Sequence, residues 1–224
     1  MAGKGKKKSG SAAASGARTY SSPLRERQRA ETRAAVIDAA TERFVEHGYA
    51  ATSIAAVART AGVSPETVYT TFGSKRELLR AAVMAAATGV DEGGLVVGPD
   101  LLERVRAEPD ARQRLELMGE ATSGTVQRVG PLDEVVRAAA AGDPEIAALA
   151  AEQDAQKLRD VRVLVSLLAD AGPLRMSERD ATDVVWALGQ STGLYRRLTV
   201  DRGWSHKKAF TAVNDAIARA ILAE

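Results

Sequence analysis

Apolar residues along the chain recur mainly at intervals of three and four, the spacing that places them on one face of a helix. Val36, Ile37, Ala40 and Phe44 form such a stripe on a first helix of roughly 24–47. Sustained alternation of apolar and polar residues is absent, as are Asn-Gly and Asp-Gly hairpin turns. The pattern therefore predicts an all-α fold. Further helices are expected at about 100–107, 110–128, 131–141, 144–171, 177–200 and 206–222.

After the first helix, which Gly48 should end, helix caps and stops follow at short intervals. Thr52 or Ser53 can cap a second helix of about two turns, and Gly62 supplies the left-handed residue that ends it. Ser64 can cap a third helix, in which Pro65 occupies the first position. The sequence thus predicts two short helices joined by a tight turn.

The third helix should run from about 65 to 72, because Gly73 follows it. Ser74 and Glu77 then form an S-x-x-E capping box at the start of a fourth helix. Two short helices with a glycine-centred turn are typical of a helix-turn-helix. A three-helix core without a binding role would explain the apolar positions, but not the spacing, the caps and the basic context together.

Positive charge is concentrated in the first part of the chain. Of 31 Lys and Arg and 29 Asp and Glu, residues 1–88 hold 14 and 7, which leaves 17 and 22 for the remainder. This asymmetry indicates a nucleic-acid footprint, although a basic solubilising tail would also contribute to it. Residues 1–22, rich in Gly, Ala, Ser and Lys, are expected to be a disordered arm, either only solvated or in contact with phosphates.

The segment TSIAAVARTAGVSPETVYTTFGSKRELL resembles the signature of the tetracycline-repressor (TetR) family of bacterial transcription regulators. The resemblance implies an N-terminal DNA-binding domain at 23–90 and a helical ligand-binding and dimerisation domain at 91–224, in a homodimer. It departs from the family at Thr71, often aromatic or His there, and at Glu66, an acid near DNA that costs affinity unless it accepts from a cytosine amine or points aside. Carried over by position, the residues implied to contact double-stranded operator DNA are Ser53, Ser64, Pro65, Glu66, Thr67, Tyr69, Thr70 and Lys75.

The last two expected helices carry the candidate dimer interface. One apolar stripe lies on the final helix, and a stripe with small members lies on the helix before it, where a partner could approach closely. Both stripes could instead pack on their own subunit. The interface candidates are Ala187, Ser191, Leu194, Leu198, Phe210, Val213, Ile217 and Ile221.

A ligand site is expected among the middle helices, where larger or polar side chains lie on apolar faces. Any of these side chains could equally be plain core. The low aromatic content of 4% argues against a stacking cage for a flat cation and favours a small, hydrophobic effector. The candidates are Met118, Thr122, Val126, Leu164, Leu168, Trp186, Gln190 and Tyr195.

Other protein classes find little support in the residues. The chain has no cysteine and two histidines, His47 and His206, neither in a metal-ligand spacing, and it carries no nucleotide-binding or nucleophile motif. No apolar run reaches the roughly 20 residues of a membrane span. We therefore expect a cytoplasmic, ligand-released repressor without enzymatic activity, cofactor or metal. The alternatives are a regulator with a vestigial pocket and, behind it, an enzyme with an unrecognised site in the C-terminal domain.

Overall fold

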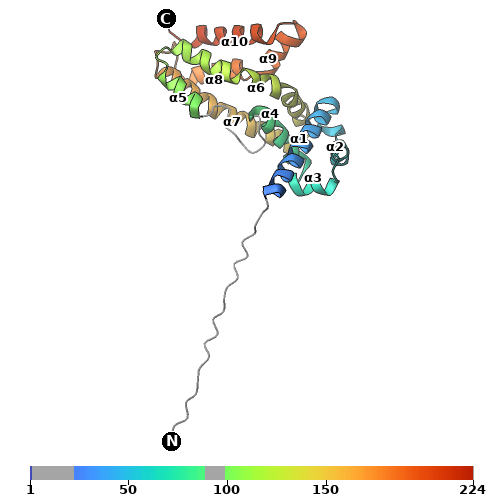
Figure 1. The fold of residues 1–224 in the computed structure, drawn as a ribbon. Helices are drawn as coiled ribbons and strands as arrows, with labels where there is room; N and C mark the ends of the chain where they lie inside the picture. Colours follow the sequence, from blue (N-terminus) through green and yellow to red (C-terminus); the bar gives the residue numbers. More distant parts are fainter. Residues whose placement is uncertain (2–22, 89–98, 224) are drawn as a thin grey trace.

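The computed structural model describes residue 1, residues 23–88 and residues 99–223, so the expected N-terminal arm and the segment around residue 90 lie outside the described residues. Within these ranges the chain folds into helices, and its β-structure is limited to one bridge between Leu174 and Leu222. The all-α prediction is confirmed. Figure 1 shows a helical head at one end of the molecule and a longer helical body beyond it.

The head consists of α1 (Pro23–Ala51), α2 (Ile54–Ala61), α3 (Pro65–Phe72) and α4 (Lys75–Thr88). The apolar stripe of α1 is buried as expected, with Ala40 and Phe44 fully inaccessible. Gly48 ends the regular helix as predicted. Its φ of 78° and ψ of 170° are not helical, and a separate short turn to Ala51 follows the kink.

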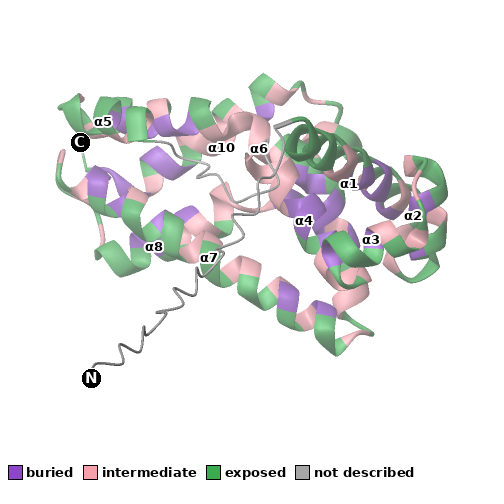
Figure 2. Cartoon of the chain, turned by 60° about the horizontal axis from the view of Figure 1, so that its bottom comes forward, coloured by how far each residue is buried: buried purple, intermediate pink, exposed green. Residues whose placement is uncertain are grey.

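The buried core of the head extends into the helices that follow it. Buried side chains of α1 to α4 form one cluster with Val129, Leu132 and Val136 of α6 and with Ile146 and Leu149 of α7. Helix α4 packs against both α1 and α6. Figure 2 shows this distribution, with buried residues on α1 and α4 and exposed residues on much of α3. The core is therefore continuous across the predicted domain boundary.

The body contains α5 (Pro99–Ala107), α6 (Ala111–Ala140), α7 (Pro144–Ala169), α8 (Glu178–Gly189), α9 (Thr192–Arg196), a π-helical turn η1 (Arg197–Asp201) and α10 (His206–Ile221). A second buried cluster joins α5, α6, α7, α8 and α10. Side chains cap several of these helices, since Asp143, Ser177 and Ser205 each accept a hydrogen bond from the first turn that follows.

One expected break in the body is wrong. The helices predicted at 110–128 and 131–141 form one helix, α6, with Pro131 inside it. Packing explains its continuity, because Val129 and Leu132 on either side of the proline are buried in the head core, while Leu115 and Met118 are buried in the body core. Tertiary contacts of this kind override the cost of a proline within a helix.

The helix predicted over 177–200 is interrupted instead. It ends at Gly189, and Ser191 caps the separate helix α9 by accepting a hydrogen bond from Leu194 N at 3.1 Å. The hydroxyl of Thr192 donates to buried Asp133 on α6 at 2.5 Å. This contact needs the chain to turn away from the axis of α8, which gives a physical reason for the break.

Candidate functional site

The turn between α2 and α3 is set by caps on both sides of it. Ser53 Oγ accepts from Ala56 N at 3.1 Å at the start of α2. Gly62, with a φ of 70°, reverses the chain, and Val63 N donates back to Ala58 O at 3.0 Å. A side chain at a positive φ would be strained, which accounts for glycine at this position.

Helix α3 is short but firmly attached to the head. Ser64 Oγ accepts from Thr67 N at 3.2 Å, and Pro65 occupies the first helical position. Val68 and Phe72 point inward, with exposed fractions of 0% and 8%. A helix of eight residues is marginal in isolation, so these two apolar anchors hold it in place.

The remaining face of α3 is open. Tyr69 is 55% exposed although it is a large aromatic residue, and Glu66 and Thr70 are exposed beside it. Thr71 donates its hydroxyl to Thr67 O at 2.7 Å, so this donor is already used within the helix. Seven of the eight residues implied to contact DNA lie on α3 or at the starts of α2 and α3, and their contacts with DNA stay predictions.

Glu66 is the one acid among these residues. The pKa of Glu66 is lowered because its carboxylate accepts from its own backbone N–H and from the hydroxyl of Ser64 at the start of α3. The side chain is therefore ionised at neutral pH and is turned back onto its own helix. This orientation favours a local capping role over a contact with a base in the major groove.

Lys75, the eighth predicted DNA contact, is engaged inside the head. Its ammonium donates to Tyr49 O at 3.0 Å and to Thr52 O at 3.1 Å, and it lies 4.1 Å from the centre of the Tyr49 ring. Burial lowers the pKa of Lys75. Two of its three N–H donors thus join α4 to the end of α1, and a phosphate contact, which stays a prediction, would use the third.

Helix α4 is attached to the body near both of its ends. At its start, Arg76 lies 3.3 Å from a carboxylate oxygen of Glu152 and also donates to Glu145 O, both on α7. Towards its end, Arg128 of α6 donates to Ala86 O at 2.9 Å. Movement of α6 or α7 would therefore displace α4, and through α4 the head core.

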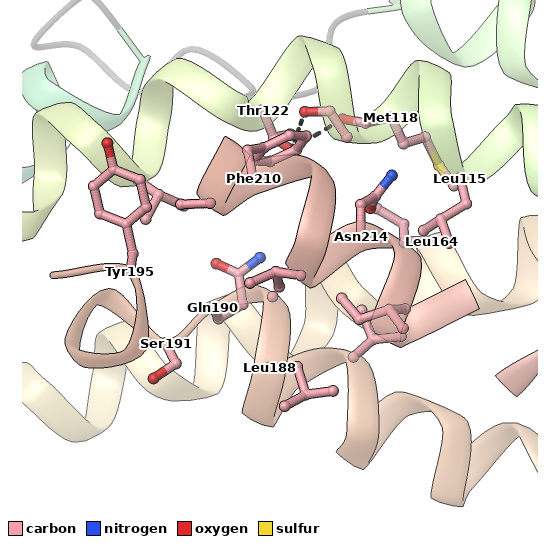
Figure 3. Close-up of a pocket in the computed structure, with 17 residues that line it drawn as sticks. Leu115, Met118, Thr122, Leu164, Leu188, Gln190, Ser191, Tyr195, Phe210 and Asn214 are labelled. Atoms are coloured by element: carbon pink, nitrogen blue, oxygen red, sulfur yellow. Dashed lines mark hydrogen bonds between the residues drawn. The ribbon is translucent and has the colours of Figure 1, made fainter. Parts of the chain in front are cut away.

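The body contains a small cavity of about 70 Å³ between α6, α8 and α10 (Figure 3). Six predicted ligand residues line it: Met118, Thr122, Val126, Leu164, Gln190 and Tyr195. Leu168 does not, because it is fully buried in the body core, and Trp186 does not line it either. The residues missed from sequence include Gly119, Leu188, Phe210 and Asn214.

Ile217 and Ile221, both predicted for the dimer interface, are buried in their own chain, with exposed fractions of 3% and 0%. Phe210 and Val213 of the same stripe line the cavity. The apolar stripe of α10 faces its own subunit, the alternative that the sequence left open. Of the other candidates, Ala187 is exposed, and three are half-buried: Ser191, Leu194 and Leu198.

Asp133 is a buried charge that the sequence analysis did not single out. Its carboxylate accepts from Thr192 of α9, from Arg137 of α6 at 2.8 Å and from Lys157 of α7 at 3.1 Å. Burial alone would raise the pKa of Asp133, but the Thr192 hydrogen bond, the Lys157 charge and the Arg137 hydrogen bond together lower it. The network joins α9, which begins beside the cavity, to the half of α6 that packs on the head.

Other site types find no support among the described residues. Over 23–88 and 99–223 no three His, Asp or Glu side chains gather as a metal site would require. Nor does any helix in these ranges combine the length and apolar character of a membrane span. His47 is near Arg43 and Glu46, and His206 accepts from or donates to the Tyr195 hydroxyl at 2.8 Å.

Comparison with known proteins agrees with this geometry. The profile of the bacterial regulatory proteins of the tetR family matches residues 36–82, which cover most of the head. No curated protein sequence matches the chain at a significant level.

Solved structures with the same fold cover nearly the whole body as well. NalD of Pseudomonas aeruginosa, the secondary repressor of the MexAB-OprM multidrug efflux pump, superposes with a TM-score of 0.67 at 20% identity, over 88% of this chain and 99% of that one. The TetR-family regulator PfmR of Thermus thermophilus gives 0.60 at 21% identity, over 83% and 97%. A protein of Saccharomonospora viridis in complex with choline gives 0.60 at 20%, over 87% and 99%.

The resemblance to the tetracycline-repressor family is confirmed. The family profile covers the helix-turn-helix head, and the fold of the chain is that of TetR-family transcription regulators.

Proposed function

We propose that the protein binds operator DNA as a homodimer through the exposed face of α3 and is released from it by a small effector bound in the body. The observation that carries the DNA-binding part is the arrangement of α3. Its two apolar residues are buried, its ends are fixed by caps, and its polar face is open at Glu66, Tyr69 and Thr70. Hydroxyl side chains suit contacts with phosphates and base edges in the major groove.

A homodimer would present two such helices related by a two-fold axis. The operator would then be an inverted repeat whose half-sites lie about one helical turn, roughly 34 Å, or a multiple of it apart. The outer surface of α8 at Ala187 and the adjoining α9 are the parts of the predicted interface that remain accessible. We infer that the partner packs there and not on the inward stripe of α10.

The effector would act through the connections between cavity and head. Ser191 lines the cavity, and the next residue, Thr192, donates to Asp133 of α6. Helices α6 and α7 in turn hold α4 through Arg128 and Arg76. A ligand that moves the start of α9 or the middle of α6 would thus change the position of α4 and the separation of the two heads.

The size of the cavity supports this mechanism. About 70 Å³ is far below the roughly 300–1,000 Å³ typical of small-molecule sites. An effector must therefore favour a conformer in which the cavity is wider. A preference of about 10⁴-fold for that conformer would be enough to swing the population from the DNA-bound to the released state.

The test is selection of bound duplexes from a random pool by the full chain. We expect an inverted repeat, two chains per selected duplex, and an affinity that falls steeply with salt. If the selection recovers no preferred sequence, sequence-specific DNA binding would be contradicted. A screen of metabolites and hydrophobic compounds for release of the selected duplex then tests the effector, independently of the DNA result.

A further inference from the structure

The cavity in the body is lined by apolar side chains and by two carboxamides whose hydrogen-bonding groups are unused. Gln190, at the end of α8, and Asn214, on α10, both line it (Figure 3). Within the part of the chain that the structure describes, neither side-chain amide has a hydrogen-bond partner. We propose that the cavity selects an uncharged effector whose polar end bonds to these two carboxamides; the inference rests on the effector site proposed above.

The other polar groups of the cavity already have partners. Thr122 donates its hydroxyl to Met118 O at 2.9 Å, Ser191 Oγ accepts from Leu194 N at 3.1 Å, and the Tyr195 hydroxyl is bonded to His206. Gln190 and Asn214 can each offer one acceptor and two donors. Both amides are half-buried and lack a partner among the described residues, so their donors and acceptors are available to a ligand in the cavity.

Charge is missing from the lining. Among the 17 described residues around the cavity there is no Asp, Glu, Lys, Arg or His. A carboxylate, phosphate or ammonium group bound there would lose its water without gaining an opposite charge, which is far more costly than burying a neutral amide or carbonyl. The ligand class is therefore an apolar molecule that carries an amide, ester, lactone, ketone or hydroxyl.

Gly119 of α6 makes room for one of the two carboxamides. A methyl group at this position would lie 3.0 Å from Asn214 Nδ2 and 3.1 Å from Phe210 Cζ. The glycine thus lets α10 bring the side chains of Asn214 and Phe210 close to α6. Gly130 lies on the same helix, and a methyl group there would meet nothing within 4 Å, which makes it a matched control.

Asn214 is the only asparagine of the chain, so it can be observed alone. We would label the full-length protein with ¹⁵N-asparagine and follow the side-chain amide signals by NMR. The probes are hexanamide, hexanoate and hexylammonium, which share chain length and differ in charge. We expect hexanamide to shift the signals in a saturable way and to bind at least about tenfold more tightly than either ion.

Two variants separate the carboxamide contacts from general effects on the fold. Gly119→Ala should weaken hexanamide by about tenfold or more, since it displaces the Asn214 amide, whereas Gly130→Ala should leave the affinity unchanged. Gln190→Leu retains the asparagine label and should weaken hexanamide by about three- to tenfold, the effect of one lost hydrogen bond.

Different results would overturn this inference and the proposed function. Equal or tighter binding of hexanoate or hexylammonium, no response to any of the probes, or an unchanged affinity in Gly119→Ala and Gln190→Leu would overturn the inference. Failure of the proposed function has a different readout, namely no effector that releases the selected duplex. Hexanamide binding without any change in DNA affinity would leave the cavity chemistry standing.

Discussion

The head and the body of this molecule use the same kind of secondary structure for opposite purposes. In the head, short helices are capped at their starts, their apolar residues are fully packed, and the polar groups of α3 face outward. In the body, longer helices leave a cavity of about 70 Å³ and enclose polar groups, among them the Asp133 network. The head is built to hold one shape, and the body retains an interior that can adjust.

The two regions are joined by a shared buried core. One buried cluster extends from α1 to α7, so the head is continuous with the nearer half of α6. The cavity lies against the farther half of the same helix, at Leu115, Met118 and Gly119. A single long helix, continuous through Pro131, thus contacts both the head core and the cavity in the body.

The largest effect should follow from removing an anchor of α3. Phe72→Ala deletes a buried aromatic ring and is expected to lower the free energy of unfolding by about 3–5 kcal/mol. Tyr69→Ala, on the open face of the same helix, should change it by less than about 0.5 kcal/mol. Chemical denaturation of both variants measures the difference, and similar losses would mean that α3 is not held as described.

A comparable loss should appear in dimerisation when charge is placed on α8. Ala187→Glu would bury an unpaired carboxylate in the proposed interface, at a cost of several kcal/mol of association free energy. Ala138→Glu, at an exposed position of α6, is the matched control and should stay dimeric. Sedimentation gives the oligomeric state, and a dimeric Ala187→Glu variant would locate the interface elsewhere.

A smaller loss is expected in the body at Asp133. Asp133→Asn should lower the free energy of unfolding at pH 7 by about 1–3 kcal/mol, because Lys157 and Arg137 lose their carboxylate partner but can recover water.

The same variant predicts a pH dependence. The pKa of Asp133 is lowered in the folded chain, so its stabilising contribution is complete above the ordinary Asp value near 3.9 and is lost as the pH falls through the folded pKa. The stability difference between wild type and Asp133→Asn should therefore shrink below pH about 4. A difference that is constant down to pH 2 would contradict the lowered pKa.

The smallest effect on stability should come from the link between α4 and α7. Glu152 is 62% exposed, so its pair with Arg76 contributes at most about 1 kcal/mol. We expect Arg76→Ala to leave the fold nearly unchanged but to weaken effector-driven release of DNA. Arg80→Ala, whose side chain pairs with Glu77 on its own helix, is the control. Equal release by both variants would argue against transmission through Arg76.

The two regions differ as well in what their sequences predict. The starts of α2, α3 and α4 were predictable because serine caps and glycine stops act within a few residues. In the body, six cavity residues could be anticipated from polar or large side chains on apolar faces, but the stripe of α10 could not be assigned. Phe210, Val213 and Ile217 look the same in sequence whether they meet a partner, a core or a cavity.

Breaks within long helices were unpredictable for the same reason. Pro131 stays inside α6 and α8 ends at Gly189 because of contacts with distant elements, such as the hydrogen bond from Thr192 to Asp133. Asp133 lies in the mainly apolar stretch GPLDEVV. A charged residue in such a stretch could have indicated a buried, paired carboxylate. Two of the partners of Asp133, Lys157 and Thr192, lie 24 and 59 residues away in the chain, and so depended on the fold.

The central claim is that the open face of α3 reads DNA while its buried face only supports it. The most direct measurement is a fluorescence anisotropy titration of the selected operator, at one salt concentration, with wild type, Tyr69→Ala and Thr211→Ala. Thr211 is exposed on α10 in the body. The account predicts that Tyr69→Ala weakens operator binding by about 1–3 kcal/mol, roughly five- to 150-fold, and that Thr211→Ala binds as wild type does. An unchanged affinity in a folded Tyr69→Ala variant would contradict it.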